Sequence, residues 1–219
     1  MVERSLARHR VMRMVLAGIT AVLVGVAGGQ SASAQGVVDE WASIKAPPAP
    51  ALGRVAVAPK TTALLVLDLA SQTCNATQRP RCIAMLPRLK PLLAKARAKG
   101  WFVVYTLGAA STTADILPEV AMLGSEPVVT SGPDKFVATD LEKILKDHGI
   151  KTVIAIGAAA HGAVLHTAAG SAFRGFNVVV PVDGMAADNA YAEQYTTWDL
   201  VNAPRLGDRV KLTALDWIE

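Results

Sequence analysis

The segment Thr152-Val153-Ile154-Ala155-Ile156-Gly157 decides the fold of this chain, together with the turn that follows it. Its run of β-branched and apolar residues predicts a buried strand. The turn, AAAHGAV at 158–164, consists mostly of small residues and predicts a sharp connection into a helix. In open α/β sheets, ligands bind beyond the carboxyl ends of the strands. This turn is therefore a candidate site.

Strands and helices alternate from residue 62 onward. We expect strands at 62–69, 101–107, 150–157, 176–182 and 210–215. We expect helices at 83–99, 116–123, 140–148, 162–174 and 188–197. Thr139 and Glu142 would form a capping box for the third helix, and Pro87 and Pro91 would kink the first helix or confine it to its second half. The alternation predicts an α/β, three-layer Rossmann-like fold, with a mainly parallel sheet flanked by helices on both faces.

The first 34 residues have the pattern of a secretory signal peptide. Four arginines precede an uncharged stretch from Met14 to Gly29, and Ala32-Ser33-Ala34 supplies a small-residue cleavage site. We expect cleavage after Ala34 and a periplasmic or secreted protein that does not contact the membrane. A retained membrane anchor is the alternative, which the glycines in the apolar stretch disfavour.

Cleavage would leave a leader and one domain. Residues 35–60 are rich in Ala and Pro and predict an extended leader, and residues 61–219 have the length of a single domain. The whole chain has a net charge of +4, but removal of the signal takes away four Arg and one Glu and leaves 18 basic and 17 acidic residues. A balance of +1 gives no reason to expect a nucleic-acid partner.

Several segments resemble the isochorismatase-like cysteine hydrolases in their order and spacing. They are TALLVLD at 62–68, FVATDLE at 136–142, GAAAHGAVLHT at 157–167, and RGFNVVV at 174–180 followed by Asp183. The resemblance extends over roughly residues 60 to 190. It implies a hydrolase that acts on a small molecule, and we also expect a homo-oligomer.

Most enzymes of that family use an aspartate, a lysine and a cysteine. The resemblance places the aspartate at Asp68 and the cysteine position at Ala163, so thiol catalysis is not expected. The family lysine would fall on Thr130, and Lys135 is the only nearby substitute. The catalytic candidates are therefore Asp68 and Lys135.

The turn after residue 157 is the expected substrate-binding element, through Ala159, Ala160, His161 and Ala163. Isochorismatases proper also lack the cysteine and carry a small residue there after an Ala-His pair, which Ala160-His161 resembles. His161 would bond a substrate oxygen, or alternatively satisfy a backbone carbonyl in the core.

Asp68 and Lys135 also have interpretations without catalysis. A buried carboxylate must be paired or hydrogen-bonded, and Asp68 could simply cap the loop that follows it. Lys135 could be solvated in its turn, or pair with Asp68. If the protein is an enzyme, we expect Asp68 to act as general acid or base. Water would attack directly, without a covalent intermediate, and a vinyl ether is a substrate that allows this. The alternative is a non-catalytic periplasmic module that binds a ligand or partner, which a solvent-facing Lys135 would support.

Cys74 and Cys82 are the only two cysteines. An even count in an exported protein predicts a disulfide between them. The alternatives are a free, reactive Cys74 close to Asp68, or two inert thiols.

Neither a metal nor a cofactor is expected. The nicotinamidase branch of the family binds a metal through histidines that follow a second aspartate, but this chain has no histidine between His9 and His148. No glycine pattern of the dinucleotide or phosphate-loop type is present.

Overall fold

Residues 36–219 are described by a computed structural model, and the predicted signal peptide at 1–34 lies outside them. The chain divides into two units, Met1–Ala46 and Pro47–Glu219. Within the first unit, α1 (Val37–Glu40) is a single short turn of helix with no buried residue. Within residues 36–219, no helix combines the length and the apolar character needed to cross a membrane.

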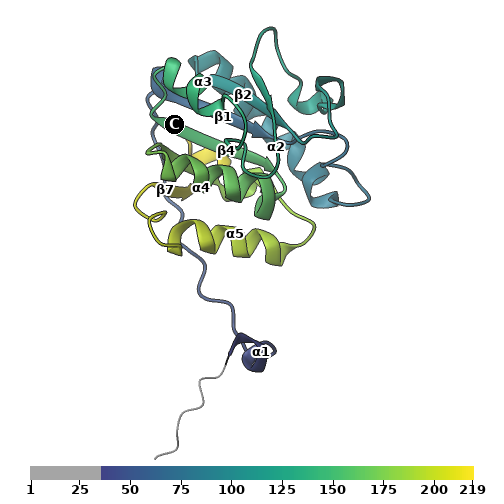
Figure 1. Cartoon of the computed structure of the whole chain (residues 1–219), viewed down its shortest axis with the longest axis vertical. Coiled ribbons are helices and arrows are strands. Elements are labelled where there is room, and N and C mark those ends of the chain that lie inside the picture. Colours follow the sequence, from purple (N-terminus) through teal and green to yellow (C-terminus); the bar gives the residue numbers. More distant parts are fainter. Residues whose placement is uncertain (1–35) are drawn as a thin grey trace, which may run out of the picture. The chain divides into compact units, whose positions relative to one another are not determined.

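A parallel sheet is the centre of the second unit (Figure 1). Six strands follow one another across it in the order β3-β2-β1-β4-β5-β7, and the short β6 pairs with the end of β4. Their bounds are β1 Thr62–Leu67, β2 Phe102–Leu107, β3 Val128–Thr130, β4 Thr152–Ala158, β5 Asn177–Pro181, β6 Met185–Ala186 and β7 Val210–Thr213. Every ladder between these strands is parallel, which confirms the predicted sheet.

Helices cover both faces of the sheet, as predicted for three layers (Figure 1). One apolar cluster packs α3, α4 and α5 against one face, and a second packs α2 against the other. The helices are α2 Pro80–Lys99, α3 Leu141–Asp147, α4 Leu165–Phe173 and α5 Ala190–Asn202. The short helical turns are η1 Pro59–Thr61, η2 Thr113–Asp115, η3 Pro118–Val120, η4 Ala160–Val164, η5 Val182–Gly184 and η6 Leu215–Trp217.

The sequence of β1 is apolar throughout because helices cover both faces of this strand. Leu65 and Leu67 belong to the cluster under α3, α4 and α5, whereas Leu64 and Val66 belong to the cluster under α2. Successive side chains of a strand point to opposite faces, so a central strand covered on both sides buries every residue.

Part of the predicted leader runs along the domain. The N–H of Gly53 donates to the carbonyl of Leu212 at 3.0 Å, and Val55 forms a parallel bridge with Ile218. Residues 53–57 thus extend the domain beyond the strands that the sequence pattern indicates.

Three local predictions need correction. Helix α2 begins at Pro80 and is not confined to its second half; Pro87 and Pro91 both lie on its exposed side, where water can reach the carbonyls that lose a partner. The helix predicted at 116–123 is only the turn η3, and Pro118 stands at its start. The short strands β3 and β6 were not predicted.

The capping box predicted for α3 is also absent. Asp140 is the N-cap, and the Thr139 hydroxyl donates to the carbonyl of Lys135. Glu142 instead forms ion pairs with Lys146 at 2.5 Å and with Arg174 at 3.0 Å. The Thr139 oxygen accepts from the N–H of Leu141 at 3.3 Å rather than from that of Glu142, so neither side chain makes its capping-box contact.

Candidate active site

The carboxyl ends of three neighbouring strands meet at one edge of the sheet. Leu67, the last residue of β1, is in register with Thr106 of β2 and with Gly157 of β4. Asp68 follows β1 directly, and the turn η4 follows β4. The register therefore brings Asp68, Thr106 and the turn to the same edge, where ligands of such sheets bind.

Gly157 allows the closest approach in this region. Its φ is +134°, and a Cβ atom at this position would lie 2.0 Å from the carbonyl oxygen of Leu67. Only glycine fits this backbone conformation beside β1. The peptide bond between Ala158 and Ala159 is cis.

Asp68 is held by groups from other elements. The backbone φ of Asp68 is +52°, in the left-handed region that Asp and Asn tolerate better than most residues. Oδ1 accepts a hydrogen bond from the hydroxyl of Thr106 at 2.7 Å, and Oδ2 lies 2.7 Å from Nζ of Lys135. The carboxylate is thus oriented by β2 and by the loop after β3, rather than used to cap its own loop.

Lys135 is the partner of Asp68 and has no exposed side-chain surface. Its ammonium also donates to the carbonyl oxygens of Leu107, at 3.2 Å, and Ser131, at 3.0 Å. An ammonium has three donors, so these two carbonyls and the carboxylate satisfy it completely. Lys135 is therefore not solvated. It pairs with Asp68 even though the family resemblance places the lysine at Thr130.

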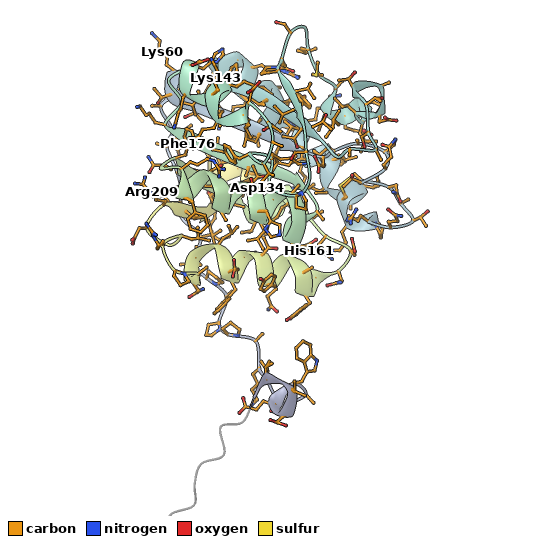
Figure 2. All side chains as sticks on the ribbon, in the orientation of Figure 1. Lys60, Asp134, Lys143, His161, Phe176 and Arg209 are labelled. Carbon is orange, nitrogen blue, oxygen red and sulfur yellow. A yellow bond between two sulfur atoms is a disulfide. The ribbon has the colours of Figure 1, made fainter. Side chains whose placement is uncertain are left out.

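The segment that carries Lys135 is fixed on α4. The backbone N–H of Lys135 donates to the hydroxyl of Thr167 at 3.2 Å, and that hydroxyl donates to the carbonyl of Pro133, also at 3.2 Å. The guanidinium of Arg174 stacks over the ring of Phe136, with 4.3 Å between Cζ and the ring centroid. Figure 2 shows Asp134, the residue before Lys135, against α4.

The turn η4 is wound as a π-helix and interrupted at Gly162, whose φ and ψ are −115° and −105°. Ala160 and Ala163 are buried, and the N–H groups of Gly162 and Val164 both donate to the carbonyl of Ala159. His161 is exposed, so it does not satisfy a carbonyl within the core. The turn thus presents backbone and small side chains rather than a nucleophile.

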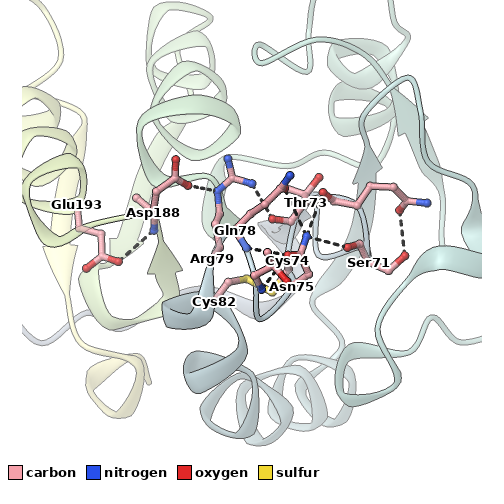
Figure 3. Close-up of a disulfide and its surroundings, with 12 residues drawn as sticks. Ser71, Thr73, Cys74, Asn75, Gln78, Arg79, Cys82, Asp188 and Glu193 are labelled. Atoms are coloured by element: carbon pink, nitrogen blue, oxygen red, sulfur yellow. Dashed lines mark hydrogen bonds and ion pairs between the residues drawn. A yellow bond between two sulfur atoms is a disulfide. The ribbon is translucent and has the colours of Figure 1, made fainter.

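Cys74 and Cys82 are joined by a disulfide, as predicted (Figure 3). They are the only cysteines of the chain, so neither the free, reactive Cys74 nor the pair of inert thiols is correct. Arg79, within the loop that the disulfide closes, forms an ion pair of 2.6 Å with Asp188. The disulfide thus anchors the loop that leads from Asp68 to α2.

Residues 62–207 match the family model described as the isochorismatase domain. The chain belongs to the isochorismatase family. Its match covers the whole sheet except β7, and it includes Asp68, Lys135 and the turn η4. The comparison with curated proteins gave no match.

Solved structures of the family share the fold. An isochorismatase family protein from Desulfovibrio vulgaris aligns with a TM-score of 0.65 and 19% identity, over 71% of this chain and 95% of that one. N-carbamoylsarcosine amidase from Thermoplasma acidophilum gives 0.59 and 21%, over 71% and 97%. The nicotinamidase from Staphylococcus aureus gives 0.62 and 19%, over 69% and 99%. At these identities the likeness shows the isochorismatase fold.

Two residues of this isochorismatase-family site were missed in the sequence. Thr106 and Thr167 hold Asp68 and Lys135 through contacts between residues far apart in the chain. A threonine near the carboxyl end of an apolar strand was the available signal for Thr106. Among residues 36–219, no group of three or more His, Cys, Asp and Glu side chains is arranged to hold a metal ion.

Proposed function

We propose that this protein is an exported hydrolase that acts on a small molecule through acid–base chemistry of Asp68, with water as the nucleophile. The buried ion pair between Asp68 and Lys135 at the carboxyl edge of the sheet is the observation that supports this function. An ion pair withdrawn from solvent costs desolvation free energy, so sites that contain one often use it for chemistry. Export rests on the signal pattern at 1–34.

The role of each group follows from its contacts. Asp68 keeps 11% of its side-chain surface exposed, while Lys135 keeps none, so only the carboxylate can meet a substrate or water. Lys135 and Thr106 hold the carboxylate in one orientation. The carbonyl of Ala159 takes the N–H groups of Gly162 and Val164, so the first two N–H groups of η4, those of Ala160 and His161, would orient a substrate oxygen.

The hydrolysis of a vinyl ether needs only these groups and water. The Asp68 carboxylate would take up a proton from solvent and transfer it to the enol carbon, which produces an oxocarbenium ion. Water would add to the cationic carbon and return a proton to the Asp68 carboxylate. The resulting hemiketal would break the C–O bond to the former ether oxygen, and its hydroxyl proton would pass to that oxygen, which releases a carbonyl compound and an alcohol. No step requires a covalent bond to the protein.

Hydrolysis without a thiol agrees with the chain's composition. Both cysteines are in the disulfide, and alanine occupies position 163, where the family resemblance places the nucleophile. The two similar enzymes named above are an amidase and a nicotinamidase, so small amides belong among the candidate substrates beside enol ethers and esters. For amides and esters, Asp68 would act as general base toward water.

An activity screen of the purified protein against small amides, esters and enol ethers tests this function. Asp68→Asn is the decisive variant, because asparagine tolerates the same positive φ but cannot exchange a proton as a carboxylate does. We expect it to lower kcat by roughly 10²–10⁴-fold. Asp147→Asn, which alters an exposed ion pair on α3, should leave activity unchanged. Full activity in Asp68→Asn would exclude the proposed role, and ligand binding without turnover would favour the non-catalytic module.

A further inference from the structure

A hollow of about 330 Å³ lies at the amino edge of the sheet, between the end of α4 and the segment that joins α5 to β7. Its walls are Ala172, Phe173, Gly175, Arg205 and Arg209. Gly175 comes shortly before β5 and Arg209 directly before β7, so the hollow is at the edge opposite to Asp68. Figure 2 likewise shows Arg209 and His161 on different sides of the domain. The hollow is therefore separate from the candidate active site.

The two arginines of this hollow differ from the other arginines in residues 36–219. The others each form an ion pair with a carboxylate; they are Arg54, Arg79, Arg81, Arg88, Arg97 and Arg174. Within the same range Arg205 and Arg209 form none, although Asp208 is the neighbour of Arg209 in the chain. Nη1 of Arg209 donates to the carbonyl oxygen of Gly175 at 2.8 Å, which leaves most of the guanidinium N–H groups for another acceptor.

The backbone beside the hollow is firmly held. Leu206 is buried, its N–H donates to the carbonyl of Ala203 at 3.2 Å, and its own carbonyl accepts from the N–H of Arg209 at 2.9 Å. Arg205 has a φ of +69° in this turn. Glycine or asparagine would adopt that left-handed conformation with less strain, and strained residues cluster at sites of function. The strain thus indicates a role for the Arg205 side chain.

Phe173 adds an apolar wall to the two guanidinium groups. It is the last residue of α4, and it is 62% exposed. An exposed ring of this kind can stack with the ring of a ligand. The planar fork of a guanidinium matches the oxygens of a phosphate group through paired hydrogen bonds. The hollow thus offers one apolar surface and two anion-binding groups.

We propose that this hollow binds a small aromatic phosphate monoester, with the phosphate between Arg205 and Arg209 and the ring on Phe173. A phosphate monoester carries a charge of about −1.5 to −2 at pH 7, which two guanidinium groups balance, whereas a carboxylate would balance only one. The volume is near the lower end of the roughly 300–1,000 Å³ of ligand sites, which suits a molecule with a single ring.

Isothermal titration calorimetry of the purified protein with phenyl phosphate tests the proposal. Wild type should bind it saturably, and more tightly than inorganic phosphate or phenol, because each of these supplies only part of the contacts. Arg205→Asn and Arg209→Gln should each raise the Kd roughly 10–100-fold, because each removes charge-assisted hydrogen bonds. Asparagine also tolerates the positive φ at position 205, and glutamine keeps a donor for the carbonyl of Gly175.

Three further variants locate the ligand. Lys90→Gln is the matched control and should leave the Kd unchanged, because Lys90 is an exposed cation on α2, outside the hollow. Phe173→Ala should raise the Kd for phenyl phosphate toward that for inorganic phosphate. Asp68→Asn should bind phenyl phosphate as the wild type does, since Asp68 is at the other edge of the sheet.

Several results would overturn the proposal. These are the absence of saturable binding by the wild type, an unchanged Kd in both arginine variants, an equal loss of affinity in Lys90→Gln, and benzoate binding as tight as that of phenyl phosphate. Loss of binding in Asp68→Asn would also overturn it, because the ligand would then occupy the candidate active site. None of these results depends on the proposed hydrolysis, because no turnover is measured.

Discussion

Nζ of Lys135 lies 2.7 Å from Oδ2 of Asp68, and the lysine is withdrawn completely from solvent while the aspartate is not. The two residues come from loops after different strands, 67 positions apart in the chain. The asymmetry of their exposure indicates that the carboxylate is the group presented outward and the ammonium is its support.

The Asp68–Lys135 pair should contribute to stability as well as to the site. Lys135→Met leaves the carboxylate without its cation, and loss of one partner of a buried ion pair costs about 3–5 kcal/mol in the free energy of unfolding. Urea denaturation measures this loss. Lys143→Met, at the exposed pair with Asp147, should leave the unfolding midpoint unchanged.

The double variant Asp68→Asn/Lys135→Met measures the interaction free energy between the two side chains. We expect it to lose less stability than the sum of the two single variants, because each single change already abolishes the interaction. Strict additivity would contradict a direct interaction between these side chains.

The disulfide should leave no reactive thiol. Thiol titration of the denatured, non-reduced protein should find none, and two free thiols would contradict the bond between Cys74 and Cys82. The double variant Cys74→Ser/Cys82→Ser should lose roughly 2–3 kcal/mol, the chain-entropy value for so short a loop. Reduced wild type is the matched control and should unfold at the same denaturant concentration as the double variant.

Hydrolytic activity should resist iodoacetamide, since neither cysteine is available as a thiolate. Residual activity after prolonged incubation measures this. Ala163→Cys is the matched control, because alkylation of a thiol placed in the turn η4 should block substrate binding. Rapid inactivation of the wild type would show that a cysteine takes part after all.

Tyr105 should titrate far above the ordinary range. Burial raises the pKa of Tyr105 to about 12, and the nearby guanidinium of Arg97 opposes this shift only in part. Its hydroxyl donates to the carbonyl of Val120 at 2.8 Å. Ultraviolet titration of the folded protein should show a tyrosinate step near pH 12, which Tyr105→Phe removes.

The same shift in the pKa of Tyr105 predicts a direction for alkaline stability. The folded state holds the Tyr105 proton more tightly than the unfolded state, so the contribution of this group is fully present below the ordinary value of 10.0 and is lost as the pH rises through about 12. Tyr105→Phe should therefore show a smaller loss of stability over this interval. An equal loss in both proteins would contradict the shift.

The sequence predicted the long strands because central parallel strands must be apolar on both faces. Strands β3 and β6 have three and two residues, too few to show a period, and they form because neighbouring strands already offer free backbone groups. The capping box at Thr139 failed for a related reason. The Thr139 hydroxyl donates to the carbonyl of Lys135, a contact set by the tertiary position of that segment, and in this orientation its oxygen accepts from the N–H of Leu141 rather than from that of Glu142.

The resemblance named Asp68 but placed the lysine at Thr130, so Lys135 was predicted only as a nearby substitute. Asp68 and Lys135 were candidates, and the structure brings them together. Thr106 was missed because its role depends on the register between β1 and β2, which places Leu67 beside it. Register is a property of strand pairing, so no local pattern around Thr106 contains it.

Gly157 lies in β4 beside Leu67, the residue before Asp68, so its replacement should disturb both the sheet and the site. In Gly157→Ala, the new Cβ would lie 2.0 Å from the carbonyl oxygen of Leu67 and 2.8 Å from its carbon, at a φ of +134°. Both obstacles are backbone atoms of the neighbouring strand, so relief requires β1 and β4 to separate where Asp68 is held. We expect a loss of more than about 3 kcal/mol, the range of strained backbone and overpacked core substitutions. Gly53→Ala is the control, because a Cβ added at Gly53 would meet no atom within 4 Å. Urea denaturation compares the two variants, and equal unfolding midpoints would show that β1 can yield at Leu67 without cost.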